Sequence, residues 1–200
     1  MQVGILGIQG DFEKHQTILR TLGAEGKIVR YAHELDSISG LIIPGGESTA
    51  ITHIIRRMNL IHPLKQFALS KSVFGTCAGL IMMARNGSDT RVESLEILDV
   101  TVKRNAYGRQ VFSFSEELEL TDPNNARKVI GTFIRAPKIE RVGPQVNILA
   151  SLNDEPVAIQ GGFHIGISFH PELDGESYFH EKFLSQCELA LKGQEKSNVA

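Results

Sequence analysis

The chain has 200 residues, of which 42% are hydrophobic, and a formal net charge of -2 at pH 7. This length and apolar content suffice to bury one sizeable core, and no Pro/Gly/Ser-rich linker divides the chain. We therefore expect one domain over residues 1–192 and a flexible polar tail over residues 193–200. Lys and Arg are scattered rather than clustered, so the composition excludes a basic surface for nucleic acid.

Localisation can also be predicted from composition. The opening residues 1–6 enter a strand-like pattern directly, without the features of a secretion signal, and no apolar run is long enough to cross a bilayer. Cys77 and Cys187 are the only cysteines, which excludes a disulfide framework and suits a reducing compartment. We expect a cytoplasmic protein that does not associate with membranes.

In the first half of the chain, strand-like and helical patterns alternate. Residues 3–8 are a near-continuous apolar run typical of a buried parallel strand, and a helix capped by Asp11 and ended by Gly23 follows. Further strands are expected at residues 27–30, 40–43 and 72–74, with helices after residue 48, capped by Ser48 or Thr49, and at residues 63–69. This alternation predicts an α/β fold with a parallel core.

The second half is mostly strand-like and more polar. Residues 97–152 are typical of an antiparallel excursion from the parallel core. Two strands at residues 157–160 and 163–169 should form a hairpin that turns at Gly161-Gly162. A final helix is expected from about Ser177 to Leu191.

The motif with the clearest chemistry is Gly75-Thr76-Cys77-Ala78-Gly79, at the junction of an apolar strand and a helix. In a nucleophile elbow, a tight turn exposes the central side chain and flanking glycines remove clashing Cβ atoms. The amides at the start of the helix favour a thiolate and can bind an oxyanion. A lone cysteine after a strand is more often a small buried hydrophobe, but the paired glycines favour a nucleophile.

A base for this nucleophile is suggested by Phe169-His170-Pro171-Glu172, which follows a predicted buried strand. Extended geometry before the proline should project His170 and Glu172 to the same side, so that the carboxylate holds the imidazole. Cys77, His170 and Glu172 then form a candidate catalytic triad. A structural histidine, or a metal site with His164 and His180, is the alternative. Because no HExxH or CxxC motif is present, we expect no metal.

Residues 44–48, Pro-Gly-Gly-Glu-Ser, follow a strand and precede a helix at the sheet edge where open α/β folds bind ligands. The amide of Gly46, with that of Ala78, is a candidate oxyanion hole. The alternative is a plain tight turn with a helix cap. The loop lacks the lysine and spacing of a phosphate-binding loop, so no nucleotide is implied.

Together, these three motifs resemble the class I glutamine amidotransferases. The resemblance implies a three-layer α/β/α sandwich with a mostly parallel, flavodoxin-like central sheet. It also implies that Cys77 is the nucleophile and that His170 and Glu172 are the charge relay. The reaction implied is hydrolysis of L-glutamine to L-glutamate and ammonia through a thioester, with no cofactor.

Residues 7–10, 45–49, 104–110 and 133–137 resemble, more narrowly, the glutaminase subunit of pyridoxal 5'-phosphate synthase. This resemblance implies a partner, a separate (β/α)8-barrel synthase subunit that receives the ammonia through a tunnel. Gln9 is a candidate for shaping the oxyanion loop, and Gln9 and Gly10 are candidates for the partner interface. Lys14 and Ile167 depart from the family pattern but do not touch the triad. The L-glutamine contacts implied are Gly46, Glu47, Ser48, Arg104, Ile134 and Arg135.

Two alternatives remain open. One is the glutaminase subunit of another amidotransferase, such as imidazole glycerol phosphate synthase. The other is a cysteine-based redox or chaperone protein of DJ-1-like type, which would lack the His-Pro-Glu motif. An α/β-hydrolase is disfavoured because there the acid precedes the histidine in the chain, whereas Glu172 follows His170.

Overall fold

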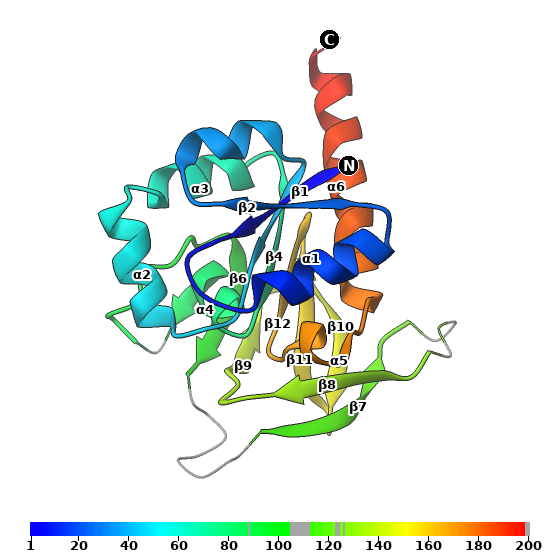
Figure 1. Cartoon of the computed structure of the whole chain (residues 1–200). Coiled ribbons are helices and arrows are strands. Elements are labelled where there is room, and N and C mark those ends of the chain that lie inside the picture. The colour runs from blue at the N-terminus through cyan, green and yellow to red at the C-terminus, as the bar shows by residue number, and fades with distance from the viewer. Residues whose placement is uncertain (88, 105–112, 123–124, 126, 199–200) are drawn as a thin grey trace.

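A computed structural model describes the chain except residues 88, 105–112, 123–124, 126 and 199–200, and describes residues 194–198 by their backbone alone. Helices cover both faces of a large sheet (Figure 1). The helices are α1 (Phe12–Thr21), α2 (Ser48–Arg57), α3 (Ile61–Ala68), α4 (Ala78–Met83), α5 (Pro171–Asp174), α6 (Tyr178–Asn198) and the 3-10 helix η1 (Ala32–Ser37). The expected α/β architecture is confirmed.

The main sheet has nine strands in the order β2-β1-β3-β4-β12-β11-β10-β7-β8, and a smaller sheet has the order β5-β6-β9. The first five strands of the main sheet run parallel, and the remaining pairs are antiparallel. The strands are β1 (Gln2–Leu6), β2 (Glu25–Val29), β3 (Gly40–Ile43), β4 (Ser72–Thr76), β5 (Ala84–Gly87), β6 (Leu98–Lys103), β7 (Phe114–Leu120), β8 (Val129–Phe133), β9 (Lys138–Val142), β10 (Val146–Leu152), β11 (Glu155–Gly161) and β12 (His164–Ile167).

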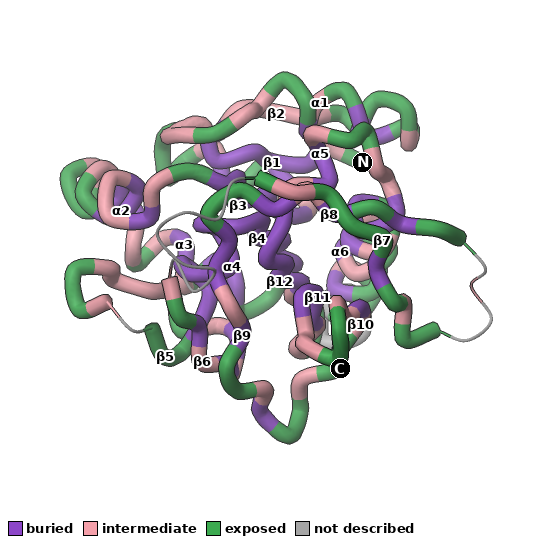
Figure 2. Tube along the Cα trace, turned by 90° about the horizontal axis from the view of Figure 1, so that it is seen from below, coloured by how far each residue is buried: buried purple, intermediate pink, exposed green. Residues whose placement is uncertain are grey.

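Two hydrophobic clusters fill the two faces of the main sheet. Successive residues of β3 point to opposite faces, so Leu41 and Ile43 pack with α2, α3 and α4, whereas Ile42 packs with α1 and α6. Figure 2 shows β3, β4 and α4 as buried and much of β7 as exposed. The apolar runs that predicted parallel strands therefore belong to strands covered on both sides.

Neighbouring strand ends position the site. β4 pairs with β12 in parallel, with Thr76 opposite Ile167, and the Cys77 amide donates to the Ile167 carbonyl over 2.9 Å. Cys77 and the segment leading to His170 therefore leave the sheet side by side at its carboxyl edge. This is the edge at which open α/β sheets bind ligands.

The antiparallel excursion is divided between the two sheets. β7, β8 and β10 extend the main sheet beyond β11, whereas β6 and β9 pair with β5 in the smaller sheet. The β11–β12 hairpin is antiparallel and turns after Gly161, as expected. The pairing of β5 with β6 is parallel.

Two expected helix boundaries are wrong. The N-cap of α2 is Glu47 rather than Ser48 or Thr49, because its carboxylate accepts from the amides of Thr49 and Ala50. The last helix does not end at Leu191, since α6 continues to Asn198 and includes residues expected in the tail. A single glycine, Gly193, costs a helix only about 1 kcal/mol, and the following Gln-Glu-Lys run favours helix.

None of the described helices is both long and apolar enough to span a membrane.

The contact of α4 with β3 yields a stability prediction. A Cβ at Gly79 would lie 2.0 Å from the Ile43 carbonyl oxygen, which is fixed in the sheet. We expect Gly79→Ala to lower the free energy of unfolding by about 2 kcal/mol through this overpacking, measured by urea denaturation. Gly193→Ala, at an exposed helical position with open space around it, is the control and should raise stability slightly. Equal effects of the two substitutions would contradict the steric argument.

Candidate active site

Cys77 occupies the predicted sharp turn between β4 and α4. Its φ of 50° and ψ of -103° lie outside the ordinary regions for a residue with a side chain. The turn is possible because Gly79 packs directly on the backbone of Ile43 and Gly75 packs on Met83. The two glycines of the motif thus leave room for the tight turn, and this is the reason for which the sequence predicted a nucleophile elbow.

The imidazole of His170 is held by Glu172. His170 is the N-cap of α5, and its Nδ1 lies 2.7 Å from Oε1 of Glu172, which is in the first helical turn. The expected contact is confirmed, but it is made around a helical turn rather than along an extended strand. A backbone bond from the His170 amide to the Thr132 carbonyl, 2.8 Å, fixes the segment to β8.

The environment of His170 favours its charged form. Burial opposes that charge, but interactions with Cys77 and Glu172 outweigh burial and raise the pKa of His170 to about 10. The ring also packs closely on the 44–48 loop, because a Cβ at Gly45 would lie 2.2 Å from its Cε1 atom. The thiol of Cys77 is buried, with its sulfur 3.9 Å from the Ile134 carbonyl oxygen. The three residues of the candidate triad therefore form one interacting group.

The 44–48 loop is held from the first strand of the sheet. The Glu47 amide donates to Oε1 of Gln9 over 2.9 Å, and a Cβ at Gly46 would lie 2.9 Å from the same oxygen. Gly10 approaches Gly45 so closely that a Cβ there would lie 2.5 Å from its carbonyl oxygen. Gln9 thus shapes the loop, one of the two roles expected for it, and Gly10 also packs on the loop.

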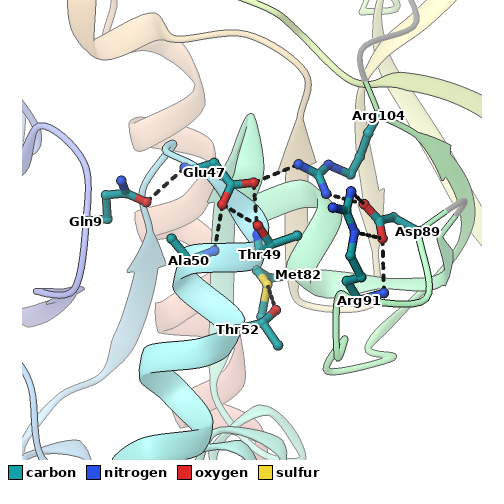
Figure 3. A network of polar contacts seen from close by, with 9 residues as sticks. All are labelled: Gln9, Glu47, Thr49, Ala50, Thr52, Met82, Asp89, Arg91 and Arg104. Carbon is teal, nitrogen blue, oxygen red and sulfur yellow. Dashed lines mark hydrogen bonds and ion pairs between the residues drawn. The ribbon is translucent and has the colours of Figure 1, made fainter.

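The carboxylate of Glu47 belongs to a polar network shown in Figure 3. It accepts from the Ala50 amide over 2.7 Å and from the hydroxyl of Thr49. The Thr49 hydroxyl is the main reason that the pKa of Glu47 falls to about 2; burial opposes this shift, and the two helix amides and Arg104 add to it. The side chain is therefore a helix cap and a fixed anion.

Arg104 lies between two carboxylates. Its Nη2 donates to Glu47 over 2.7 Å, and its Nη1 donates to Asp89. Asp89 is also bound by Arg91, whose Nη2 lies 2.7 Å from Oδ2. Asp89 and Arg91 were not predicted, because a short charged stretch in a sequence gives no sign that it will fold over a site. Residues 105–110 of the motif that begins at Arg104 lie outside the described residues.

A cavity of about 250 Å³ joins these groups. That volume is below the roughly 300–1,000 Å³ typical of drug-sized ligands, and it suits an amino acid. Ile81, one helical turn after Cys77, was not predicted and forms part of the wall. Ala78 begins α4 and is buried, and it does not line the cavity. The lining residues are Gly46, Glu47, Ser48, Cys77, Ile81, Arg104, Ile134, Arg135 and His170.

The metal alternative finds no support in the part of the chain that the structure describes. Among those residues, no group of three or more His, Cys, Asp or Glu side chains is arranged to hold a metal ion. His164 lies at the start of β12, the opposite end of that strand from His170, and accepts from the Val73 amide over 3.3 Å.

Comparison with known proteins gives a consistent family. The model of the SNO glutamine amidotransferase family matches residues 5–189. Pyridoxal 5'-phosphate synthase subunit PdxT of Fervidobacterium nodosum is 43% identical, over 94% of this chain and 98% of that protein. The subunit of the same name from Thermosipho africanus is 44% identical, over 92% of this chain and 98% of that protein.

Solved structures agree. A crystal structure of a glutamine amidotransferase superposes with a TM-score of 0.86 at 40% identity, covering 93% of this chain and 98% of that one. A putative GMP synthase protein from Thermoplasma acidophilum, with a TM-score of 0.68 at 16% identity and 98% of each chain covered, shares the fold. The extent of the family match and the identity to relatives over nearly the whole chain show that this protein belongs to the SNO glutamine amidotransferase family.

Proposed function

We propose that the protein hydrolyses L-glutamine to L-glutamate and ammonia and supplies the ammonia to a pyridoxal 5'-phosphate synthase. The observation that carries this proposal is the cavity in which a strained cysteine meets a carboxylate-held histidine. The names of the relatives favour this synthase over imidazole glycerol phosphate synthase. The two free cysteines suit the cytoplasm, where we place the reaction.

In the first step, the proton of the Cys77 thiol is on His170, and the sulfur of Cys77 attacks the side-chain amide carbon of glutamine. The amide of Gly46, which lines the cavity, is one proposed donor to the oxyanion that develops on the amide oxygen. The second is the amide of Ala78, which is outside the lining but directly follows Cys77 at the start of α4. His170, which carries a proton at neutral pH because its pKa is about 10, donates that proton to the leaving nitrogen. Ammonia departs and a thioester between Cys77 and the glutamyl group remains.

In the second step, water attacks the thioester carbon and gives its proton to His170. The carbon–sulfur bond breaks, glutamate leaves, and the imidazolium and thiolate are restored. Glu172 accepts from Nδ1 of His170 in both steps and so fixes the ring orientation. Arg104 supports glutamine binding by holding Glu47 and by placing positive charge on the wall of the cavity.

The proposed partner is a (β/α)8-barrel synthase subunit that docks near Gln9 and Gly10. Both residues contact the 44–48 loop directly, so a protein bound to them can change the conformation of that loop. The rate of glutamine hydrolysis should then depend on the partner, and this dependence would prevent ammonia from being released to solvent when no synthase is bound.

The nucleophile is tested with the two cysteines of the chain. We expect Cys77→Ala to lower the rate of glutamate release at least about 1,000-fold, since the attacking sulfur is removed, while circular dichroism remains unchanged. Cys187→Ala is the matched control, because burial raises the pKa of the Cys187 thiol to about 12 and the side chain, on α6, packs in the core against Gly40 of β3. Glutamate release that survives in Cys77→Ala would refute the triad.

The binding role of Arg104 is tested by replacing its forked guanidinium group with the single ammonium group of lysine. In Arg104→Lys, a point charge cannot bridge Glu47 and Asp89, so we expect KM for glutamine to rise about tenfold with kcat nearly unchanged. Steady-state kinetics provide the measurement. Arg91→Lys, whose side chain is 75% exposed, is the control and should leave KM within about twofold of wild type. A fall in kcat alone would instead place Arg104 in the chemical step.

The pathway is tested by measuring ammonia and glutamate release from glutamine, with and without a purified pyridoxal phosphate synthase barrel subunit. We expect the barrel subunit to raise the rate of glutamate release at least about tenfold if it completes the oxyanion hole. Removal of one oxyanion-hole donor typically lowers kcat by this factor or more. Activity that does not respond to the barrel would keep the glutaminase and reassign its pathway.

A further inference from the structure

Beyond the candidate triad, a line of buried polar side chains continues from Glu172 into the protein. Only one carboxylate oxygen of Glu172, Oε1, bonds to His170. The other, Oε2, is buried and has no hydrogen-bond partner among the described residues. Nε2 of His15 lies 3.8 Å from it, and both side chains are at most 2% exposed. A buried carboxylate oxygen without a donor is costly, so its nearest polar neighbour matters.

The line continues through a second histidine. Nδ1 of His15 lies 2.9 Å from Nε2 of His180, and both residues are fully buried. His15 comes from α1 and His180 from α6, which lie on the same face of the sheet (Figure 1). The His180 ring packs edge-on against Phe74 of β4, with centroids 5.2 Å apart. The rings are thus fixed by elements that also form the core.

Both histidines are neutral at pH 7. Burial is the main reason that the pKa of His15 lies well below its ordinary value, and the nearby His180 and His170 add to this shift. Burial likewise lowers the pKa of His180 to about 3, although the Glu176 carbonyl and Glu181 partly oppose the shift. Each neutral ring carries one N–H, so the proton positions along the line are linked.

Two arrangements of the protons are compatible with one bond between the rings. In the first, His180 donates from Nε2, His15 accepts at Nδ1, and the His15 Nε2–H points at Glu172. In the second, His15 donates from Nδ1, and its Nε2 lone pair faces the carboxylate oxygen. The first arrangement points the positive end of the His15 N–H dipole at the Glu172 carboxylate, so the negative charge of that carboxylate favours it.

The surroundings of His180 bear on the same choice. The Glu176 carbonyl near this ring would favour the second arrangement if it accepted from Nδ1. Nδ1 of His180 nevertheless has no hydrogen-bond partner among the described residues, as expected of the unprotonated nitrogen in the first arrangement. We therefore assign the proton of His15 to Nε2.

We propose that His15, in the tautomer set by His180, is a positioning residue that keeps Glu172 turned toward His170. This inference rests on the proposed glutamine hydrolysis. At 3.8 Å the His15–Glu172 contact is a charge–dipole interaction rather than a hydrogen bond, and it gains strength from the dry surroundings. It acts on the reaction only through Glu172 and His170, and His15 does not line the substrate cavity.

The first test compares two replacements of His15. His15→Leu removes the N–H, whereas His15→Gln retains an amide donor. We expect His15→Leu to lower kcat about tenfold to 100-fold with KM within about twofold, and His15→Gln to recover most of the loss. His180→Phe keeps a ring against Phe74 but frees the His15 tautomer, so it should give an intermediate kcat. Wild-type kcat in all three variants would overturn the proposal, as would equal losses in His15→Leu and His15→Gln.

His164→Leu is the control for a partly buried histidine away from the site. Burial lowers the pKa of His164 to about 4, so this residue is also neutral. The control should lower Tm without changing kcat. A loss of kcat in His164→Leu that equals the loss in His15→Leu would overturn the proposal, because it would assign both effects to packing.

The second test does not depend on activity. Nitrogen-15 NMR of histidine-labelled protein reports which ring nitrogen carries the proton and the pH at which each ring titrates. We expect the proton of His15 on Nε2. In His15→Leu the pKa of His170, about 10 in the wild type, should fall because the carboxylate that bonds to it is less firmly oriented.

The two readouts separate the possible failures. A His15 proton on Nδ1, or an unchanged His170 titration in His15→Leu, would overturn the positioning role. If wild-type protein releases no glutamate from glutamine while the His170 titration still shifts, the proposed function fails and the contact from His15 through Glu172 stands.

Discussion

The site depends on one backbone constraint, the left-handed conformation of Cys77 between β4 and α4. Such a conformation costs of order 1–3 kcal/mol and persists only where its surroundings determine it. Here the Cys77 amide is bound to the Ile167 carbonyl, and Gly79 allows α4 to pack on Ile43. The turn that places Cys77 on the cavity wall therefore also fixes its sulfur relative to β12, the strand that leads to His170.

Charge in the cavity is organised by a second element, the Glu47 carboxylate. Because it caps α2 and binds Arg104, it couples the start of a helix to a guanidinium supplied by the end of β6. Gln9, in the segment that follows β1, restrains the Glu47 amide. The segments that follow β1, β3 and β6, strands of two different sheets, thus meet at Glu47, and its conformation sets the position of the cation on the cavity wall.

The buried polar groups behind Glu172 have a thermodynamic consequence as well as the role proposed for them. His15 and His180 have depressed pKa values in the folded protein, whereas in the unfolded chain they titrate near 6.5. The unfolded state therefore binds more protons below that pH, and folding stability falls as the pH is lowered from about 6.5 toward 3. His170 has the opposite sign: its raised pKa of about 10 stabilises the fold below pH 6.5 and this contribution is lost as the pH rises through 10. Buried neutral histidines such as His15 and His180 therefore lower the stability of the folded protein in acid.

Local sequence patterns were enough to predict the α/β class, the central strands, the elbow at Cys77 and the partnership of His170 with Glu172, because each depends on residues close together in the chain. Apolar runs, paired glycines and a His-Pro-Glu motif act through local geometry. The same patterns failed at the cap of α2 and at the end of α6, where a carboxylate that accepts from two amides and a tolerated glycine override the usual signals. The folded structure was needed to find that Asp89, itself bound by Arg91, holds Arg104, and that His15 and His180 meet behind Glu172. These contacts join residues from separate elements, and their formation depends on how helices pack on the sheet, which local sequence patterns do not encode.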